Sequence, residues 1–395
     1  MHLIVVSPFP PAITGIGQYG YHVTRALAES DLFTRITVLA GAAKNTDHPN
    51  HLGLTEIEYC WESGQFNARQ NILSRVRLLN PDLIWFNLGA SIFGKSPLPN
   101  LSGLLTPKFT SQLYPTIVTL HELVEFSDLR ALNAPGGPFA KWGARIITNI
   151  SASADVVCLT IHRYADQLST RGVECFHIPI GAYHEPEILD ESESQELLFF
   201  TTLAPYKGLE LLLNVFQSLR AKYSQLHLTI AGTEHVRFQE YARNLKRCFN
   251  GIQGVQWLGQ VAEEDVKELF RRAQVVVLPY AASTGSSSVL YQAATWGRPV
   301  VVSNLNEMFS IVKENDLEVE FFENHGVESL RNAIESLLDS RAKRDKQTRH
   351  NFNSMRRVRP EETTRRYIEA FNRAFEKRQI EKHIPIPPHI ELRTA

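Results

Sequence analysis

Short apolar runs alternate with amphipathic segments along most of the chain. In the first half, runs rich in Val, Ile and Leu cover residues 2–7, 35–41, 81–89, 115–121 and 154–160. Runs of this length, bounded by Gly, Pro or polar residues, are typical of strands that are buried on both faces. Between several of them lie segments with apolar residues at helical spacing, such as residues 18–30. Strands that alternate with helices predict a parallel sheet covered by helices.

The pattern restarts in the second half after a change in composition. Residues 178–196 contain two turn-forming residues, Gly181 and Pro186, and an acidic, Ser-rich run, which together are typical of a linker. The apolar runs that follow predict further strands at residues 196–203, 226–232, 273–280 and 298–304, and residues 209–223 predict an amphipathic helix. The sequence therefore predicts two α/β units of similar size, and each begins with a strand, a Gly-containing loop and a helix.

Composition narrows the classes of function. The chain has 395 residues, of which 43% are hydrophobic, and this is enough for two or three domains with packed cores. Its net charge is −1, from 41 basic and 42 acidic residues, which argues against a general nucleic-acid-binding protein. The N-terminal residues lack the pattern of a signal peptide, and no stretch reaches the ~18 apolar residues of a membrane span.

The cysteines favour a protein of a reducing compartment. The four are Cys60, Cys158, Cys175 and Cys248, and none forms a C-x-x-C pair. This spacing suggests neither a zinc knuckle nor a disulfide framework. We therefore expect reduced thiols in a cytoplasmic protein.

Ligands of doubly wound sheets bind where strands end, so the loops after strands carry the candidate chemistry. The first loop holds Gly15, Gly17 and Gly20 before a helix. This arrangement fits a tight turn that needs glycine and also fits phosphate binding, and both interpretations stay open. The second holds Lys207 and Gly208 between a strand and a helix. A lysine there reaches a phosphate as a point charge, and an ordinary surface lysine is the alternative.

A third loop is rich in hydroxyl groups. Residues 284–288 supply four of them before a helix predicted over residues 289–296. One helix cap needs one hydroxyl, so the surplus of O–H and N–H donors at the positive end of a helix predicts an anion site without formal charge. His121 and Glu122 follow another predicted strand. A neutral His121 bonds a substrate hydroxyl or satisfies loop backbone groups, and both interpretations stay open.

In this order and spacing the motifs resemble those of the retaining glycosyltransferases of family 4, over nearly the whole chain. The motifs are "TLAPYKGLELLL", "LTIAG", "VQWLGQVAEEDVKELFRRAQVVVLPY" and "WGRPVVVSNLNE", with "TGIGQYGYHVTRALAES" and "VTLHELVEF" in the first half. The resemblance implies the GT-B fold, an α/β architecture of two doubly wound Rossmann-like domains that face each other across a cleft. It also implies a C-terminal helix that packs back on the first domain.

We therefore expect four segments. These are an N-terminal acceptor-binding domain over residues 1–183, a linker over 184–195, a nucleotide-sugar-binding domain over 196–360, and a C-terminal helix and tail over 361–395. Residues 88–109 are apolar, rich in Pro and Gly, and long for a loop. Two interpretations of this segment stay open: it meets a lipid-linked acceptor or a membrane surface, or it covers the core of its own domain.

The resemblance implies roles for single residues. Lys207 matches the lysine that contacts phosphate and His121 the histidine beside the donor sugar, so both are expected to be catalytic. Val261 ends the segment that brackets the nucleotide base. The expected donor-binding residues are Gly15, Ile16, Gly17, Thr202, Lys207, Val261, Thr284, Gly285, Ser286, Ser287, Ser288 and Gln292.

Three positions depart from the family pattern. An arginine five residues before the lysine is replaced by Thr202, and the two glutamates of an E-x7-E motif are replaced by Thr284 and Gln292. Gln292 still bonds ribose hydroxyls as donor and acceptor, whereas Thr284 is shorter than glutamate and neutral. Lys207, backbone N–H groups and helix dipoles suffice to stabilise a leaving nucleoside diphosphate, so we expect an active enzyme.

The expected reaction is transfer of a hexose, glucose or a similar sugar, from a UDP-sugar to a saccharide or lipid-linked acceptor in polysaccharide or glycolipid assembly. No loop carries a D-x-D motif, so we expect no metal or other cofactor. The expected location is the cytoplasm, with peripheral contact at the inner face of the membrane left open. A non-catalytic sugar-nucleotide-binding subunit or sensor is the alternative that Thr202, Thr284 and Gln292 motivate, and an epimerase or phosphorylase of the same fold is a third.

Overall fold

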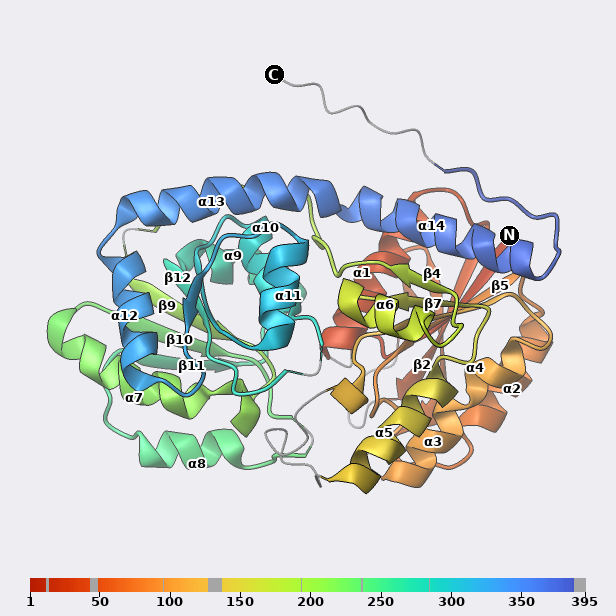
Figure 1. The fold of residues 1–395 in the computed structure, drawn as a ribbon, viewed down its shortest axis with the longest axis horizontal. Coiled ribbons are helices and arrows are strands. Elements are labelled where there is room, and N and C mark those ends of the chain that lie inside the picture. Colours follow the sequence, from red (N-terminus) through yellow and green to blue (C-terminus); the bar gives the residue numbers. More distant parts are fainter. Residues whose placement is uncertain are drawn as a thin grey trace, which may run out of the picture. The chain divides into compact units, whose positions relative to one another are not determined.

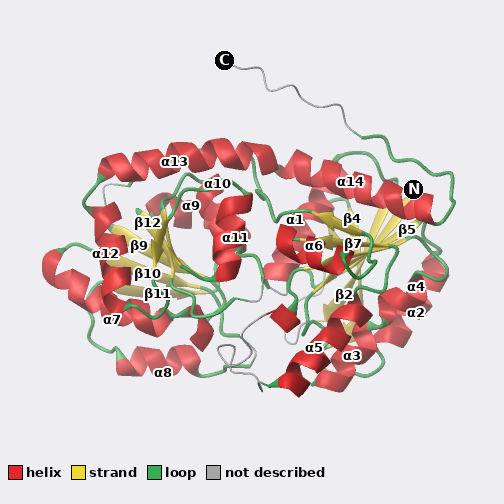
Figure 2. Ribbon diagram, in the orientation of Figure 1, coloured by secondary structure: helices red, strands yellow, loops and turns green. Residues whose placement is uncertain are grey.

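The chain forms two compact units, each built on one sheet with helices packed against it (Figures 1 and 2). The computed structural model describes residues 1–11, 14–42, 49–94, 96–126, 137–192, 194–235, 237–283 and 285–386. The first unit comprises Met1–His121, Ile146–Pro179 and Pro360–Ala395, and the second comprises Glu122–Arg145 and Ile180–Arg359.

The sheet of the first unit has the strand order β3-β4-β2-β1-β5-β6-β7-β8, and its neighbours are parallel except β3 and β4. Its strands are β1 (His2–Val6), β2 (Arg35–Ala42), β3 (His51–Leu52), β4 (Thr55–Glu62), β5 (Leu83–Leu88), β6 (Thr116–Leu120), β7 (Val156–Leu159) and β8 (Cys175–His177). β5, β6 and β7 are buried along their whole length, because helices cover a parallel sheet on both faces.

The last helix of the chain belongs to this first unit. The helices of the unit are α1 (Gly15–Glu29), α2 (Ala68–Leu79), α3 (Pro97–Leu104), α4 (Thr106–Thr110), α6 (His162–Ser169) and α14 (Pro360–Lys377), while α5 (Pro138–Ser151) spans the boundary at Arg145. α14 packs against α1, β6 and β7, and buries Tyr367, Phe371 and Phe375 at helical spacing. The return of the C-terminal helix to the first unit is therefore confirmed.

The sheet of the second unit is parallel throughout and has the order β11-β10-β9-β12-β13-β14. Its strands are β9 (Glu196–Phe200), β10 (His227–Ala231), β11 (Val255–Gly259), β12 (Val275–Leu278), β13 (Val300–Ser303) and β14 (Glu320–Phe322). The chain first adds strands on one side of β9 and then crosses to β12 on the other side. The carboxyl ends of β9 and β12 therefore form a topological switch point, which is where such sheets bind ligands.

Seven helices of the described residues complete the second unit. They are α7 (Leu209–Lys222), α8 (Tyr241–Cys248), α9 (Glu263–Arg272), α10 (Ser288–Thr295), α11 (Asn306–Glu314), α12 (Val327–Leu338) and α13 (Arg341–Met355), with short 3-10 turns at η1 (Val124–Phe126), η2 (Pro205–Lys207) and η3 (Arg356–Val358). α7 buries one apolar face against the sheet, and Leu209, Leu212, Leu213 and Phe216 on that face all lie in the hydrophobic core.

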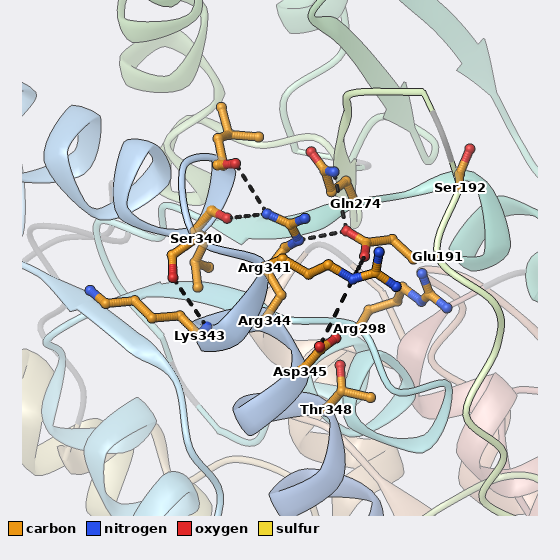
Figure 3. Close-up of polar contacts among 12 residues, drawn as sticks. Glu191, Ser192, Gln274, Arg298, Ser340, Arg341, Lys343, Arg344, Asp345 and Thr348 are labelled. Carbon is orange, nitrogen blue, oxygen red and sulfur yellow. Dashed lines mark hydrogen bonds and ion pairs between the residues drawn. The ribbon is translucent and has the colours of Figure 1, made fainter.

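The linker is tied firmly to the second unit (Figure 3). The buried guanidinium of Arg298 donates to the carbonyl oxygens of Leu189, Asp190 and Ala273, the last two at 3.1 and 3.2 Å. The Glu191 carboxylate accepts from Arg344 Nε at 2.6 Å. Residues 189–191 are therefore part of the second unit rather than a free tether.

Two details differ from the sequence-based expectations. The predicted first domain, residues 1–183, is interrupted, because Glu122–Arg145 groups with the second unit, where the backbone of Glu122 forms an isolated bridge with Gly285. The unusual segment 88–109 is not one long loop: most of it folds into α3 and α4, and it buries Phe93 and Leu104. No helix in the described ranges is long and apolar enough to cross a membrane.

Candidate active site

A glycine holds Lys207 at the switch point of the second sheet. Lys207 ends the turn η2, and Gly208 follows with φ of +72°, a left-handed conformation that leads into α7. A Cβ atom at Gly208 would lie 1.7 Å from the carbonyl oxygen of Pro279. Both the backbone angle and the space therefore require glycine, and the Lys-Gly pair is fixed at the start of α7.

The end of β12 supports this turn. The carbonyl oxygen of Tyr206 accepts from the backbone N–H groups of Ala281 and Ala282 at 2.9 and 3.3 Å. The ammonium of Lys207 lies over the ring of Tyr280, with Nζ 3.8 Å from the ring centroid. Lys207 is half-buried, and among the described residues it has no carboxylate partner. Its charge is therefore not neutralised within this part of the structure.

The Ser-rich loop leads into α10 beside this lysine turn. Ser287 is the buried N-cap residue of α10, yet its side chain does not cap the helix; its Oγ lies 3.4 Å from the hydroxyl of Tyr280. Ser283 Oγ donates to the carbonyl oxygen of Gly285 at 2.8 Å. α7 likewise begins without a side-chain cap. Neither of these two helix N-termini at the switch point is therefore capped by a side chain.

The other predicted donor residues lie at strand ends or on α10. Thr202 follows β9 and Val261 follows β11, and both are half-buried. Gln292 is half-buried on α10, whereas the residues before and after it are buried. Ser286 and Ser288 are half-buried in the same segment, and Thr284 lies outside the described residues. The second unit thus brings the predicted residues after β9, β11 and β12 to one edge of its sheet.

The glycine loop of the first unit is the first turn of a helix. α1 begins at Gly15, and Thr14 Oγ1 caps it by accepting from the backbone N–H of Gly17 at 2.9 Å. Gly15, Ile16 and Gly17 therefore have helical backbone, and the alternative of a tight turn that needs glycine does not describe them. Gly20, further along α1, is glycine because of space: a Cβ there would lie 2.4 Å from Ser7 Oγ.

His121 is held by an amide that the sequence analysis missed. Asn87 Oδ1 lies 2.5 Å from His121 Nε2, while Asn87 Nδ2 donates to the carbonyl oxygen of Ile16 at 2.8 Å and to Ser7 Oγ at 2.9 Å. Both N–H groups of the amide donate to those two oxygens. Asn87 Oδ1 is therefore the acceptor of the third hydrogen bond, and His121 Nε2 carries the proton that it accepts. Nδ1 of the neutral ring is then an acceptor.

Burial keeps that ring neutral. His121 lies at the end of β6 with 8% of its surface exposed, and its burial lowers its pKa to about 3. The ring edge packs against Tyr19, whose hydroxyl lies 2.8 Å from that of Tyr367 on α14; the latter lies 2.8 Å from Thr119 Oγ1. The C-terminal helix therefore supports the ring from within the first unit.

Signals for the missed residues were present in the sequence. Asn87 is the one amide in the apolar run of residues 81–89, and it is fully buried in β5. A buried polar side chain needs a partner, and in this unit the partners are Ser7, Ile16 and His121. For Tyr280 the sequence predicted only that it is the last residue of an apolar strand, and not that it contacts Lys207.

A pocket in the first unit is lined by none of the predicted site residues. It has a volume of about 700 Å³ along β4, and its lining includes His51, Glu56, Glu58, Tyr59 and Arg75. Two of these lining residues, Arg75 and Glu58, pair with each other at 2.5 Å.

Comparison with known proteins agrees with this architecture. A family model described as "Glycosyl transferases group 1" matches residues 194–340, which span most of the second unit. Sucrose-phosphate synthase from Thermosynechococcus elongatus superposes with a TM-score of 0.73 at 15% identity, over 95% of this chain and 99% of that one. The fold is that of the GT-B glycosyltransferases.

Two further structures agree. HepE from Anabaena, in complex with UDP-glucose, has a TM-score of 0.71 at 14% identity and covers 94% of this chain and 99% of its own. A UDP-forming trehalose-phosphate synthase from Burkholderia xenovorans has a TM-score of 0.64 at 14% identity, over 94% and 98% of the two chains. No curated protein matches this sequence. At such low identity the likeness establishes the GT-B fold, and the predicted fold class is confirmed.

Proposed function

We propose that this protein is a nucleotide-sugar-dependent glycosyltransferase that moves a hexose, glucose or a similar sugar, from a UDP-sugar to a saccharide or lipid-linked acceptor. The observation that carries the proposal is the Lys207 turn, whose cation has no carboxylate partner among the described residues and which stands at a GT-B switch point beside two helix N-termini without side-chain caps. This arrangement suits a dianionic leaving group. HepE was crystallised with UDP-glucose, which supports the choice of donor.

In the proposed reaction the leaving group is the nucleoside diphosphate. As the bond between the sugar and the β-phosphate breaks, negative charge grows on the phosphate oxygens. Lys207 and the N–H and O–H donors of Gly285–Ser288 stabilise that charge, which is the main electrostatic task of such an enzyme. In the same proposal Gln292 bonds the ribose hydroxyls, Val261 borders the base, and Thr202 offers a hydroxyl at the position where the family pattern has an arginine.

The first unit contributes a neutral hydrogen-bond partner. Because Asn87 occupies Nε2, the remaining ring atom of His121 is Nδ1, and it accepts a hydrogen bond from a hydroxyl of the donor sugar in this proposal. In the same proposal the start of α1, at Gly15, Ile16 and Gly17, also binds the phosphates, through N–H groups other than that of Gly17, which donates to Thr14 Oγ1. We propose front-face transfer with retention of configuration, in which the acceptor hydroxyl attacks on the side from which UDP departs.

We further propose that the reaction needs no metal. Lys207 and the helix N-termini supply positive potential where a metal-dependent enzyme places a divalent ion. If so, saturating EDTA leaves transfer unchanged. A rate that falls with EDTA and returns with Mg²⁺ or Mn²⁺ would reject this part of the proposal.

We propose that the protein acts at the inner face of the membrane, where it transfers the sugar to its acceptor. Its support is the exposed start of α5, where Phe139 and Trp142 are 89% and 66% exposed and Lys141 and Arg145 add positive charge. Aromatic and basic residues on one helix suit an anionic bilayer surface. The protein should float with anionic vesicles, and the double variant Phe139→Ser, Trp142→Ser should not. The exposed Phe309 of α11 gives the control, Phe309→Ser; equal flotation of all three proteins would reject the contact.

The deciding experiment combines nucleotide binding with turnover. UDP, GDP and ADP are titrated against the protein by calorimetry, and UDP-glucose is then incubated with glycan and lipid extracts. We expect UDP to bind best, and Lys207→Ala to weaken UDP binding about tenfold and to slow transfer on the order of a hundredfold. Lys267 provides the matched control, because its ammonium also lies near a ring, that of Trp296 at 5.3 Å, but pairs with Glu187 at 2.6 Å.

The same experiment separates the alternatives. UDP binding without hydrolysis or transfer to any extract would favour the non-catalytic sensor or subunit that the replacements Thr202, Thr284 and Gln292 motivate. Interconversion of free UDP-sugars would favour an epimerase, and sugar 1-phosphate formation with inorganic phosphate would favour a phosphorylase. Full transfer by Lys207→Ala, or equal losses in Lys267→Ala, would reject the assignment of Lys207.

A further inference from the structure

The contact between Lys207 and Tyr280 is closer than an incidental one. Nζ lies 3.8 Å from the centroid of the Tyr280 ring, whereas the ring of Tyr206, the residue next to Lys207, lies 5.8 Å away. Tyr280 is 1% exposed, so the ring is fixed in the core and water is excluded from its far face. A cation over the face of a desolvated ring is attracted by the ring's negative quadrupole.

Tyr280 and its two neighbours, Pro279 and Ala281, each contact the turn that carries Lys207. On one side of it, the Pro279 carbonyl oxygen leaves no room for a side chain at Gly208. On the other side, the backbone N–H of Ala281 donates to the carbonyl oxygen of Tyr206 at 2.9 Å. The backbone of the turn and the ammonium of Lys207 are therefore both set by consecutive residues at the end of β12.

The hydroxyl of Tyr280 extends this support to the second helix start. It lies 3.4 Å from Oγ of Ser287, the N-cap residue of α10. One buried ring thus contacts the cation before α7 through its face and the start of α10 through its edge. These are the two groups that the proposed function assigns to the diphosphate.

We propose that Tyr280 is the positioning residue of Lys207, and that it replaces a carboxylate as the partner that orients the ammonium. A carboxylate would fix Lys207 equally well but would cancel its charge, whereas an aromatic face orients the ammonium and leaves the positive charge for a dianion. This inference rests on the proposed function for its ligand, the diphosphate of UDP. The contact between the two side chains does not rest on it.

A purely structural role for Tyr280 predicts something different from a positioning role. Tyr280 is buried just after β12, so a small replacement opens a cavity and destabilises the unit whatever the ring does for Lys207. Shape and ring charge must therefore be varied separately. Phenylalanines with increasing numbers of ring fluorines at position 280 keep the shape and progressively weaken the negative face of the ring.

The test begins with Tyr280→Phe, which retains the ring and loses the contact with Ser287. From this variant to the most fluorinated ring, we expect the Kd of UDP to rise stepwise by about threefold to tenfold. The thermal midpoint should stay nearly constant across the series. In the Lys207→Ala background the same fluorinated series should leave the Kd of UDP unchanged, because the cation is gone. A Kd that is equal across the series, or that changes equally in both backgrounds, would overturn the inference.

A second measurement needs no nucleotide. Protons that lie over an aromatic face resonate upfield, so the CεH₂ protons of Lys207 should be shifted upfield in the wild type and in Tyr280→Phe. They should return to ordinary chemical shifts in Tyr280→Leu. The CεH₂ protons of Lys267, which lies over Trp296, are the control and should keep their chemical shifts in that variant. If UDP does not bind but the shift is present, the proposed function fails while the contact stands; if UDP binds and the shift is absent, the positioning role fails.

Discussion

Asn87 Oδ1 lies 2.5 Å from His121 Nε2, and this one hydrogen bond decides which nitrogen of a buried imidazole carries the proton. The two residues come from adjacent strands: Asn87 lies in β5 and His121 follows β6. The other side of the Asn87 amide reaches Ile16, in the first turn of α1. The orientation of the predicted histidine is thus linked to the predicted glycine turn by a single side chain.

We predict that Asn87→Leu releases the ring. The substitution leaves the carbonyl oxygen of Ile16 and the N–H of His121 without their partner, which should cost about 2 kcal/mol of stability. Transfer should slow on the order of tenfold or more, because a ring that turns misplaces its acceptor nitrogen. Nitrogen NMR of His121 should report a mixture of tautomers. In the His121→Gln background the additional loss of transfer should vanish, and an equal loss in both backgrounds would contradict the link.

Stability should fall as the solution is acidified from neutrality. Burial lowers the pKa of His121 to about 3, and burial, followed by the charges of His162 and Arg366, lowers that of His177 to about 4. Both values lie below 6.5, the ordinary pKa of a histidine side chain. Below pH ~6.5 the unfolded chain therefore takes up protons that the folded chain does not, and the free energy of unfolding falls by up to about 1.4 kcal/mol per pH unit for each histidine.

Urea titrations at several pH values between 7 and 4 measure this slope. His121→Gln should flatten it, because the substituted side chain does not titrate. Slopes that are identical in the wild type and in this variant would show that His121 does not contribute to the pH dependence. The contribution of His177 to the slope ends near pH 4 and that of His121 near pH 3, because each ring then becomes protonated in the folded state too.

Gly208→Ala should be far more damaging than alanine at an open glycine of similar backbone angle. Gly172 has φ of +78° and open space around it, so Gly172→Ala should cost about 1 kcal/mol for the angle alone. Gly208→Ala adds the clash with Pro279, which displaces backbone and should bring the cost to roughly 3 kcal/mol or more. Thermal midpoints of the two variants make the comparison. Similar midpoints would mean that the lysine turn moves away from β12 easily.

Arg298→Met should destabilise the second unit and loosen the linker. The guanidinium is 2% exposed and donates to the carbonyl oxygens of Leu189, Asp190 and Ala273, so its loss leaves several buried acceptors unpaired. A cost of about 3 kcal/mol is expected. Arg341 is the control in the same region: its side chain is 77% exposed and its ion pairs are 3.7 Å or longer, so Arg341→Met should change stability little.

Hydrogen exchange checks the linker directly. Amides of residues 187–191 should exchange faster in Arg298→Met and at the wild-type rate in Arg341→Met. Unchanged exchange in Arg298→Met would indicate that the bond between Arg344 and Glu191, together with the backbone bond from Glu187 to Thr295, is enough to hold the linker.

The sequence by itself determined most of the strands and the loops that follow them. Apolar runs of strand length and apolar positions at helical spacing are local properties, so the predicted strands agree with β1, β2, β5–β7, β9, β10, β12 and β13 to within a few residues. Local signals also located Lys207 and His121 after strands, because a polar residue that ends an apolar run lies at the edge of a sheet. The helices α3 and α4 were not predicted, nor was the grouping of Glu122–Arg145 with the second unit, since neither turn chemistry nor periodicity marks them.

Only the tertiary structure decided which side chains meet at those edges. Ser7, Asn87 and His121 lie far apart in the sequence, yet they come together because β1, β5 and β6 are neighbours in the sheet. Tyr280 meets Lys207 for the same reason, since β12 lies beside β9. Strand order is set by how helices cross over and bury the faces of the whole sheet, so it cannot be read from any single segment. The residue types at the site are thus local information, and their partners are a consequence of packing.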